Sequence, residues 1–272
     1  VLPGEPESRT LTSNFSGLTG SLGVTKSFGK HQKLKANLSS GFRSPDLAEL
    51  FSFGQHPGTN RFEIGNANFD REQSFQLDLN YALTLDRFRL DWSVFGSQID
   101  NYIFFSDTGE VQQESGLNIW QYQQVEAQLY GSEINLQYVA LENRQLKLNL
   151  GAALVRGENE DFDEPLTFIP PDNFNVKAEY RLGKLQKTAV FSKLRSVARQ
   201  DRPGFNEEET PGYTLLDFGF KHNFDFDDQN LEASLSVQNL FDKTYVDHLS
   251  ILRAFNIPSP GRNVMLNLRF YF

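Results

Sequence analysis

Cysteine is absent from this sequence, and methionine occurs once among its 272 residues. The chain therefore can form no disulfide bond and no metal site with thiolate ligands. Such a composition is compatible with an oxidising compartment. Positive charge is also scarce, because 26 Lys and Arg residues face 35 Asp and Glu residues and the formal net charge is −9. That balance argues against a nucleic-acid partner, whose phosphates need clustered Lys and Arg.

Long apolar runs and catalytic motifs are lacking as well. No apolar run approaches the roughly 18 residues of a membrane helix. The sequence holds no H-E-x-x-H, no G-x-S-x-G and no glycine-rich phosphate loop, so it gives no sign of a metalloprotease, a serine hydrolase or a nucleotide-binding enzyme. We therefore expect a protein that is not an enzyme. Aromatic residues, by contrast, are plentiful at 13%, with 25 Phe.

Strict alternation of apolar and polar residues dominates the chain. It runs over eleven residues from Phe75 to Leu85, where Phe, Leu and Tyr alternate with Gln, Asp, Asn, Ala and Thr. The same pattern recurs at 88–94, 133–140, 146–154, 174–182, 216–221, 231–237 and 264–272, and more weakly near 18–28, 33–42 and 186–198. A period of two indicates strands with one apolar and one polar face. The sequence thus predicts an all-β fold of about eleven strands.

Short and long connections alternate between these stretches. Short turns are expected near 29–32, 86–87, 142–144, 183–185 and 225–229, and long polar loops near 43–72, 105–118, 157–171, 199–211 and 239–262. Brief periplasmic turns and extended extracellular loops are typical of an antiparallel transmembrane β-barrel. A soluble β-sandwich or water-soluble barrel would show the same alternation. The length of the strands, the many Asn, Gln and charged residues on the polar face and the terminal Phe272 favour the membrane barrel.

The number of strands also suggests a part of a larger barrel. Single-chain bacterial barrels have an even number of antiparallel strands, and an open sheet would leave unpaired edges in lipid. About eleven strands are therefore expected to form the C-terminal part of a larger structure.

Three motifs lie at the two ends of the chain: "GFRSPDLAELF" (41–51), "FEIGNANFDRE" (62–72) and the C-terminal "SVQNLFDKTYVDHL…SPGRNVMLNLRFYF" (236–272). Together they resemble the motifs of TonB-dependent outer-membrane receptors. The resemblance implies a plugged barrel of about 22 strands, with residues 1–272 forming its C-terminal half and the plug and early strands absent from the chain. It further implies import of a scarce nutrient across the outer membrane of a Gram-negative bacterium. The implied partners are outer-membrane lipid, the plug, the N-terminal barrel half and the TonB–ExbB–ExbD complex.

Within that family, "ELFSFGQHPGTNRFEIGN" (49–66) is similar to a segment of zinc-uptake receptors. This resemblance aligns His56 with a histidine proposed as a metal ligand there. It implies Zn²⁺ as the transported ligand and no resident cofactor. A ferric siderophore, haem or cobalamin receptor is the alternative, followed by a passive porin-like barrel.

Two histidines are the candidate metal ligands. His56 lies in the first long loop and His248 in the last, beside Asp247. Since a zinc site needs three or four converging ligands, the others would come from outside this chain. Alternatively, His56 packs on Phe51 or Phe53 and His248 is solvated. His31 and His222 are expected near the periplasmic end, without a ligand role.

Loop carboxylates form a second candidate feature. One loop carries Glu158, Glu160, Asp161, Asp163 and Glu164, and another carries Glu207, Glu208 and Glu209. They could form a negative funnel that concentrates cations, or they could be solvated side chains that repel one another.

The first long loop is expected to begin with a brief helix over 44–51. Ser44 would be its N-cap, Pro45 its first residue and Asp46 a favourable charge near its positive end. At the end of this loop, Gly65 and Asn66 are expected to form a tight turn. Phe62 and Ile64 are expected to anchor the loop against the barrel wall. Glu72 is expected to lie at the outer rim of the barrel.

Overall fold

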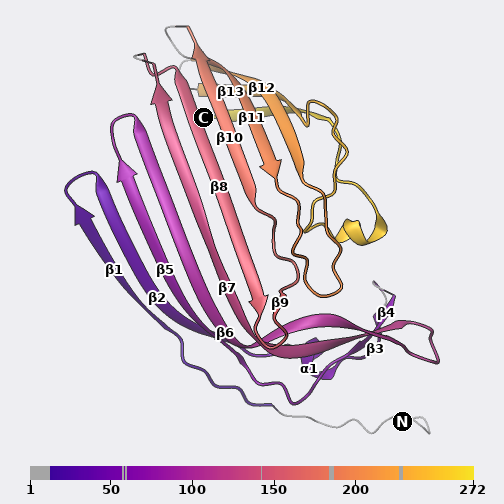
Figure 1. Cartoon of the computed structure of the whole chain (residues 1–272). Helices are drawn as coiled ribbons and strands as arrows, with labels where there is room; N and C mark the ends of the chain where they lie inside the picture. Colours follow the sequence, from indigo (N-terminus) through magenta and orange to yellow (C-terminus); the bar gives the residue numbers. More distant parts are fainter. Residues whose placement is uncertain (1–12, 57, 59, 142, 184–186, 227–228) are drawn as a thin grey trace.

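The computed structural model describes residues 13–56, 58, 60–141, 143–183, 187–226 and 229–272. Within them, eleven strands form one continuous antiparallel path (Figure 1). These strands are β1 (Gly20–Phe28), β2 (Gln32–Arg43), β5 (Glu72–Thr84), β6 (Phe88–Val111), β7 (Asn118–Ala140), β8 (Leu146–Asn159), β10 (Asn173–Leu182), β11 (Thr188–Val197), β12 (Tyr213–Phe226), β13 (Gln229–Gln238) and β14 (Asn263–Tyr271). The predicted all-β antiparallel fold is confirmed.

Three short strands and two helical segments lie among the long loops. They are α1 (Leu47–Phe51), β3 (Phe53–His56), β4 (Arg61–Ile64), β9 (Glu164–Pro165) and the 3₁₀ segment η1 (Ile251–Phe255). In the described part of the chain, no helix is both long and apolar enough to cross a membrane.

Each long strand lies beside the next along the chain, so the sheet is a meander with β1 and β14 at its two ends. Figure 1 shows a curved, open sheet with short turns at one end and long loops at the other. This layout agrees with the predicted alternation of connections. Positions 142, 184–185 and 227–228 of the predicted turns lie outside the described residues.

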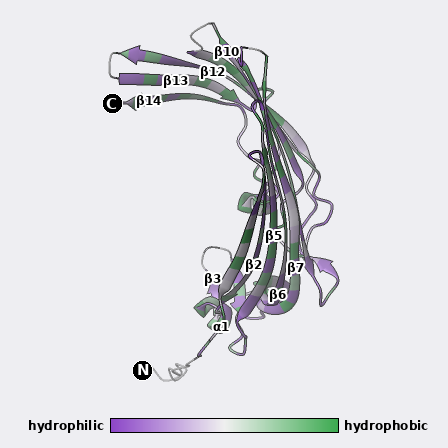
Figure 2. Ribbon diagram, turned by 90° about the vertical axis from the view of Figure 1, so that its left-hand side faces the viewer, coloured by the Kyte–Doolittle hydropathy of each residue, from purple (hydrophilic) through white to green (hydrophobic). Residues whose placement is uncertain are grey.

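One face of the sheet is apolar and exposed. Leu38 of β2 faces Leu22 of β1 and Leu77 of β5 across the ladder. At the other end, Leu235 faces Leu266. Leu22 is 71% exposed and Leu266 is 66% exposed. Figure 2 shows the resulting alternation of apolar and polar residues along the strands. An exposed apolar face of this extent is the lipid-facing wall of a membrane barrel.

The opposite face is polar. A row of directly opposed residues crosses four strands from Lys35 through Asn80 and Ser93 to Glu133. Further along the same face, the Glu179 carboxylate lies 2.9 Å from Lys221 Nζ. Charged groups of both signs are typical of the wet interior of such a barrel.

Close packing inside the sheet depends on a glycine beneath an aromatic ring. Gly219 of β12 faces Phe191 of β11. A Cβ at Gly219 would lie 2.3 Å from an atom of that ring. The ring therefore covers the glycine, as aromatic side chains do for glycines in other curved sheets.

The predicted loop at 105–118 is mostly strand. β6 has 24 residues and β7 has 23, so only residues 112–117 connect them. A register shift lies between Ile99 and Tyr102, and Asn101 there has φ 57°. The extra residue exchanges the two faces of β6. Alternation is broken at that point, which explains why the pattern did not extend into the second half of the strand.

Candidate functional site

The first long loop is built on α1. Asp46 is the N-cap and its side chain accepts a hydrogen bond from Glu49 N at 2.8 Å, while the Glu49 carboxylate accepts one from Asp46 N at 2.7 Å. This reciprocal capping box fixes the first turn. The expectation of an N-cap at Ser44 and a first helical residue at Pro45 was therefore wrong by two residues, because an Asp with a Glu three positions later satisfies both free N–H groups.

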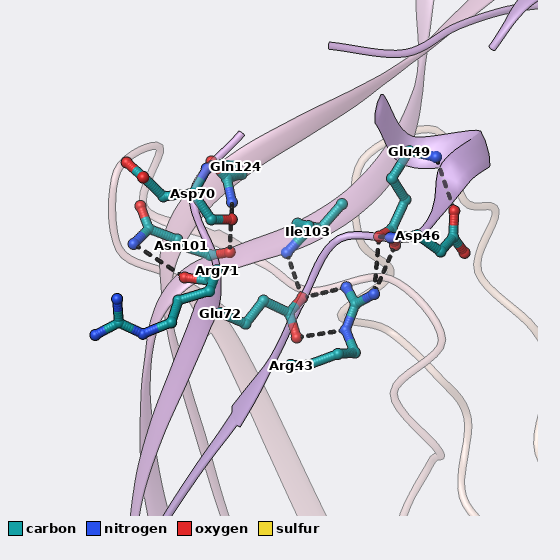
Figure 3. Close-up of polar contacts among 9 residues, drawn as sticks. All are labelled: Arg43, Asp46, Glu49, Asp70, Arg71, Glu72, Asn101, Ile103 and Gln124. Atoms are coloured by element: carbon teal, nitrogen blue, oxygen red, sulfur yellow. Dashed lines mark hydrogen bonds and ion pairs between the residues drawn. The ribbon is translucent and has the colours of Figure 1, made fainter. Parts of the chain in front are cut away.

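An ion-pair junction ties α1 to the sheet (Figure 3). Arg43, the last residue of β2, donates to both Glu72 oxygens at 2.8 and 2.7 Å. Its Nη1 donates to both Glu49 oxygens at 3.0 and 2.8 Å. Glu72 also accepts a hydrogen bond from Ile103 N at 2.7 Å. Glu72 at the start of β5 thus joins the loop to three strands.

The end of this loop packs tightly on α1. Gly65 N donates to Ser52 O at 2.7 Å, and Asn66 N donates to Glu49 O at 2.8 Å. A Cβ at Gly65 would lie 2.8 Å from backbone atoms of α1. The turn itself begins at Asn66, whose carbonyl accepts from Phe69 N at 3.3 Å. A glycine is therefore needed at position 65 so that the loop backbone can pack closely on the backbone of α1, and not because it forms the turn.

His56 lies at the end of β3, on a hairpin formed with β4. It faces Arg61 across the ladder, and its Nδ1 accepts a hydrogen bond from Gly58 N at 3.3 Å. The Arg61 guanidinium lies over the rings of Phe105 and Trp120, at 4.3 and 5.1 Å from their centroids. β4 also pairs in parallel with β7, where Phe62 faces Ile119 and Ile64 faces Gln121. The hairpin that carries His56 is thus held by stacking and by strand pairing. The ligand role of His56 stays a prediction.

His248 is buried and only 2% exposed. Its Nδ1 lies 2.6 Å from Arg253 Nη1 and 3.1 Å from Thr210 Oγ1, and its Nε2 lies 3.6 Å from Glu207. Burial and the Arg253 charge lower the pKa of His248, and Glu207 opposes them in part. The imidazole is therefore neutral near pH 7 and accepts a hydrogen bond from Arg253 through Nδ1. It links the last loop to its neighbour and is not solvated; whether it also binds metal stays a prediction.

Glu207 joins three loops, a role that its place among the candidate loop carboxylates did not predict. Its carboxylate accepts hydrogen bonds from Phe168 N at 3.2 Å, Gly204 N at 3.1 Å and Arg253 Nη2 at 3.1 Å. The Glu207 side chain is 6% exposed. Its position in a run of three acids suggested a solvated loop, and only contacts between distant segments show its role.

Most of the other loop acids also have partners. Glu158 pairs with Arg202 at 2.6 Å, and Glu160 accepts a hydrogen bond from Gln98 at 2.5 Å. Asp161 accepts one from Glu126 N at 3.0 Å. Asp163 and Glu164 are exposed. Across the residues that the structure describes, no three His, Asp or Glu side chains gather as a metal site would require. The negative funnel therefore stays a prediction. Several of the carboxylates that would form it are already paired with other groups of the chain.

The remaining histidines lie at the end of the sheet with the short turns. His31 Nδ1 is 2.9 Å from Thr84 O, and His222 Nδ1 is 2.6 Å from Thr188 Oγ1.

An open antiparallel sheet with an apolar exposed face, a polar face and packed loops at one end defines the wall of an outer-membrane β-barrel. The family is equally clear: a family model described as "TonB dependent receptor-like, beta-barrel" matches residues 3–240. The chain belongs to this family of receptors, which is not a family of enzymes, and it is a protein of the Gram-negative outer membrane.

The names of individual relatives refer to different cargoes. Heme/hemopexin utilization protein C of Haemophilus influenzae is 25% identical over 257 residues, which cover 87% of this chain and 35% of that protein. The structure of the copper transporter OprC superposes with a TM-score of 0.78 at 23% identity, over 93% of this chain and 39% of that one. The siderophore receptor PirA from Acinetobacter baumannii gives a TM-score of 0.69 at 17% identity, over 93% and 40% of the two chains. The chain thus spans less than half the length of each of these proteins.

Proposed function

We propose that this chain forms part of the wall and the loops of a TonB-dependent receptor that imports a metal-containing nutrient. The observation that carries the proposal is the family match over residues 3–240, together with loops that pack into a defined surface. The copper, siderophore and haem proteins among its relatives support a metal-containing cargo. A passive porin-like barrel is the alternative.

The open sheet supports the proposed partners. β1 and β14 are its two ends, and unpaired strand edges are not stable in lipid. We therefore expect another segment of barrel to pair with both edges, a plug to fill the lumen, and the TonB–ExbB–ExbD complex to supply energy.

Zn²⁺ is the first candidate cargo, and His56 is the residue that supports it. Its imidazole stands at the end of a fixed hairpin, and imidazole is a good ligand for zinc. The remaining ligands would come from outside the described residues.

Haem is the second candidate, because the same hairpin offers more than an imidazole. His56 could ligate iron, and Arg61, which lies directly opposite it on the same face of the hairpin, could face a carboxylate. A haem-utilisation protein is also among the relatives.

A titration of the full-length receptor distinguishes these cargoes. Zn²⁺ binding is followed by calorimetry and haemin binding by visible absorbance, in the wild type, His56→Ala and His31→Ala. Loss of a direct ligand is expected to weaken binding at least as much as loss of an outer-shell partner, about 10- to 100-fold. His31→Ala is the matched control, because His31 lies at the opposite end of the sheet. Equal affinities in all three proteins for both ligands would remove His56 from the site.

A further inference from the structure

Positive charge gathers on the polar face of four neighbouring strands, β8, β10, β11 and β12 (Figure 1). Residues directly opposite each other, and residues two apart in one strand, lie on the same face of a sheet. By this rule the cations of the face are Lys147, Lys177, Arg181, Lys193, Arg195 and Lys221, and its carboxylates are Glu179, Asp217 and Asp225. The chain has a formal net charge of −9, so this wall is opposite in sign to the chain that carries it.

Two of these charged groups are paired outside the face or at its margin. Arg195 lies 3.2 Å from Asp247 of the last loop, and Asp225 lies 2.7 Å from Lys187 beside a short turn. The other charged residues of the face form what we call the cationic patch. Its members are Lys147, Lys177, Arg181, Lys193 and Lys221, with Glu179 and Asp217 among them.

Glu179 is shared among three cations of the patch. Its carboxylate oxygens lie 2.9 Å from Lys221 Nζ, 3.4 Å from Arg181 Nε and 3.9 Å from Lys177 Nζ. The Glu179 side chain is 8% exposed, so these contacts already cover most of it. One negative charge therefore serves three positive charges and has little surface left for a fourth.

Lys147 and Lys193 form no ion pair with any residue that the structure describes. Lys193 lies directly opposite Lys177 on one side and Asp217 on the other. The Asp217 carboxylate accepts a hydrogen bond from Asn239 N at 2.9 Å and does not pair with Lys193. Like charges directly opposite each other destabilise a sheet. The wall thus carries positive charges that its own carboxylates leave without partners.

The patch lies toward the end of the sheet with the short turns. Lys147 is the second residue of β8, and Arg181 is the last but one of β10. Charges of one sign on the wall of an enclosed lumen reinforce one another's field. A resident partner would remove this repulsion permanently, whereas a cargo in transit would leave it in place for most of the time. The long loops that would capture cargo lie at the other end of the sheet (Figure 1).

We propose that the cationic patch binds an acidic surface of the plug, on which Asp or Glu side chains lie against Lys147 and Lys193. The inference rests on the proposed receptor function, which supplies the plug. Charge complementarity selects the partner, because carboxylates are the groups that the patch has too few of. Ion pairs enclosed between plug and wall are screened by salt less than ion pairs on an exposed surface.

Carbodiimide crosslinking of the purified full-length receptor tests this contact. The reagent joins an amine directly to a carboxylate that touches it, and mass spectrometry of chymotryptic peptides identifies the two residues. We expect Lys147 and Lys193 to be joined to Asp or Glu residues of the plug. Lys187 and Asp225 are the internal control, because they lie 2.7 Å apart and should be joined whether or not the proposal holds.

Lys193→Arg is the matched variant, since it keeps the positive charge but removes the reactive amine. It should lose the crosslink at position 193 and keep the one at Lys147. Crosslinks of both lysines to Glu179 or Asp217 alone, or no crosslink to the plug while the internal control reacts, would overturn the proposal. Acetylation of Lys193 that haemin alone prevents would assign the patch to an anionic cargo and overturn it as well.

The same experiment separates this inference from the proposed function. A full-length protein without a plug would refute the proposed receptor function. A plug that is present but joined to neither lysine would refute only the acidic surface inferred for it.

Discussion

Replacing Arg43 by methionine should release α1 from the sheet. The side chain of Arg43 is the one cation between the carboxylates of Glu49 and Glu72, to which it donates four hydrogen bonds. Methionine keeps the apolar stem but leaves the two carboxylates facing each other without a positive charge. The capping box of α1 is also weakened, because Glu49 is one of its two residues.

The size of the effect follows from the exposure of the three side chains. Removing one partner of a buried ion pair costs about 3–5 kcal/mol, whereas an exposed pair is worth about 0–1 kcal/mol. The Glu49 and Glu72 side chains are 11% and 14% exposed, but Arg43 is 43% exposed. We therefore expect a loss of about 2 kcal/mol in the local stability of the loop, which is about a 30-fold increase in its opening equilibrium.

Hydrogen–deuterium exchange measures that opening directly. Amides of α1 should exchange about 30-fold faster in Arg43→Met than in the wild type, while amides in the middle of β12 should not change. Arg89→Met is the control, because Arg89 pairs with Asp91 at 2.7 Å but is 60% exposed and distant from this loop. Unchanged exchange of α1 in Arg43→Met would refute the view that this junction holds the loop.

Three further outcomes are expected. Gly65→Ala should destabilise the same loop by about 1–3 kcal/mol and speed its proteolysis, whereas Gly54→Ala, with no atom within 4 Å of the new Cβ, should not. Because its pKa is lowered, His248 takes up a proton less readily in the folded than in the unfolded loop, so stability is lost as pH falls below about 6.5. The opening equilibrium of the last loop, measured as amide exchange corrected for the intrinsic exchange rate at each pH, should therefore rise between about pH 7.5 and 5.5, but not in His248→Asn. Gly219→Ala should lower the thermal stability of the barrel, and adding Phe191→Leu should restore part of it, since the ring is what the new Cβ meets.

The strands could be predicted because the membrane enforces a period of two. Residues such as Leu77 and Leu235 face lipid, and their neighbours face a polar lumen, so every strand in the bilayer carries the same pattern. Beyond the bilayer both faces meet water or packed loops, and the pattern fades. In β6, the bulge near Asn101 also interrupts the alternation of apolar and polar residues.

The candidate site was less predictable, because its contacts join residues far apart in the chain. Glu207 and Arg253 are 46 positions apart, and no sequence pattern around either residue predicts that they form an ion pair. His248 was singled out for its chemistry, but its burial depends on Thr210 and Glu207 from another loop. Local rules predicted the short helix itself, but its N-cap was expected at Ser44 and lies at Asp46, where the capping box with Glu49 fixes the first turn.

The parallel pairing of β4 with β7 has a consequence for how this loop can vary. β8 pairs with β7 only as far as Ala127, and β4 takes over the same strand at Ile119–Gln121. Without β4, that end of β7 would offer free N–H and C=O groups at the cell surface to any other extended chain. Deletions that shorten this loop are thus expected to promote association with other chains, so insertions should be tolerated at the hairpin tip far better than losses from its stem.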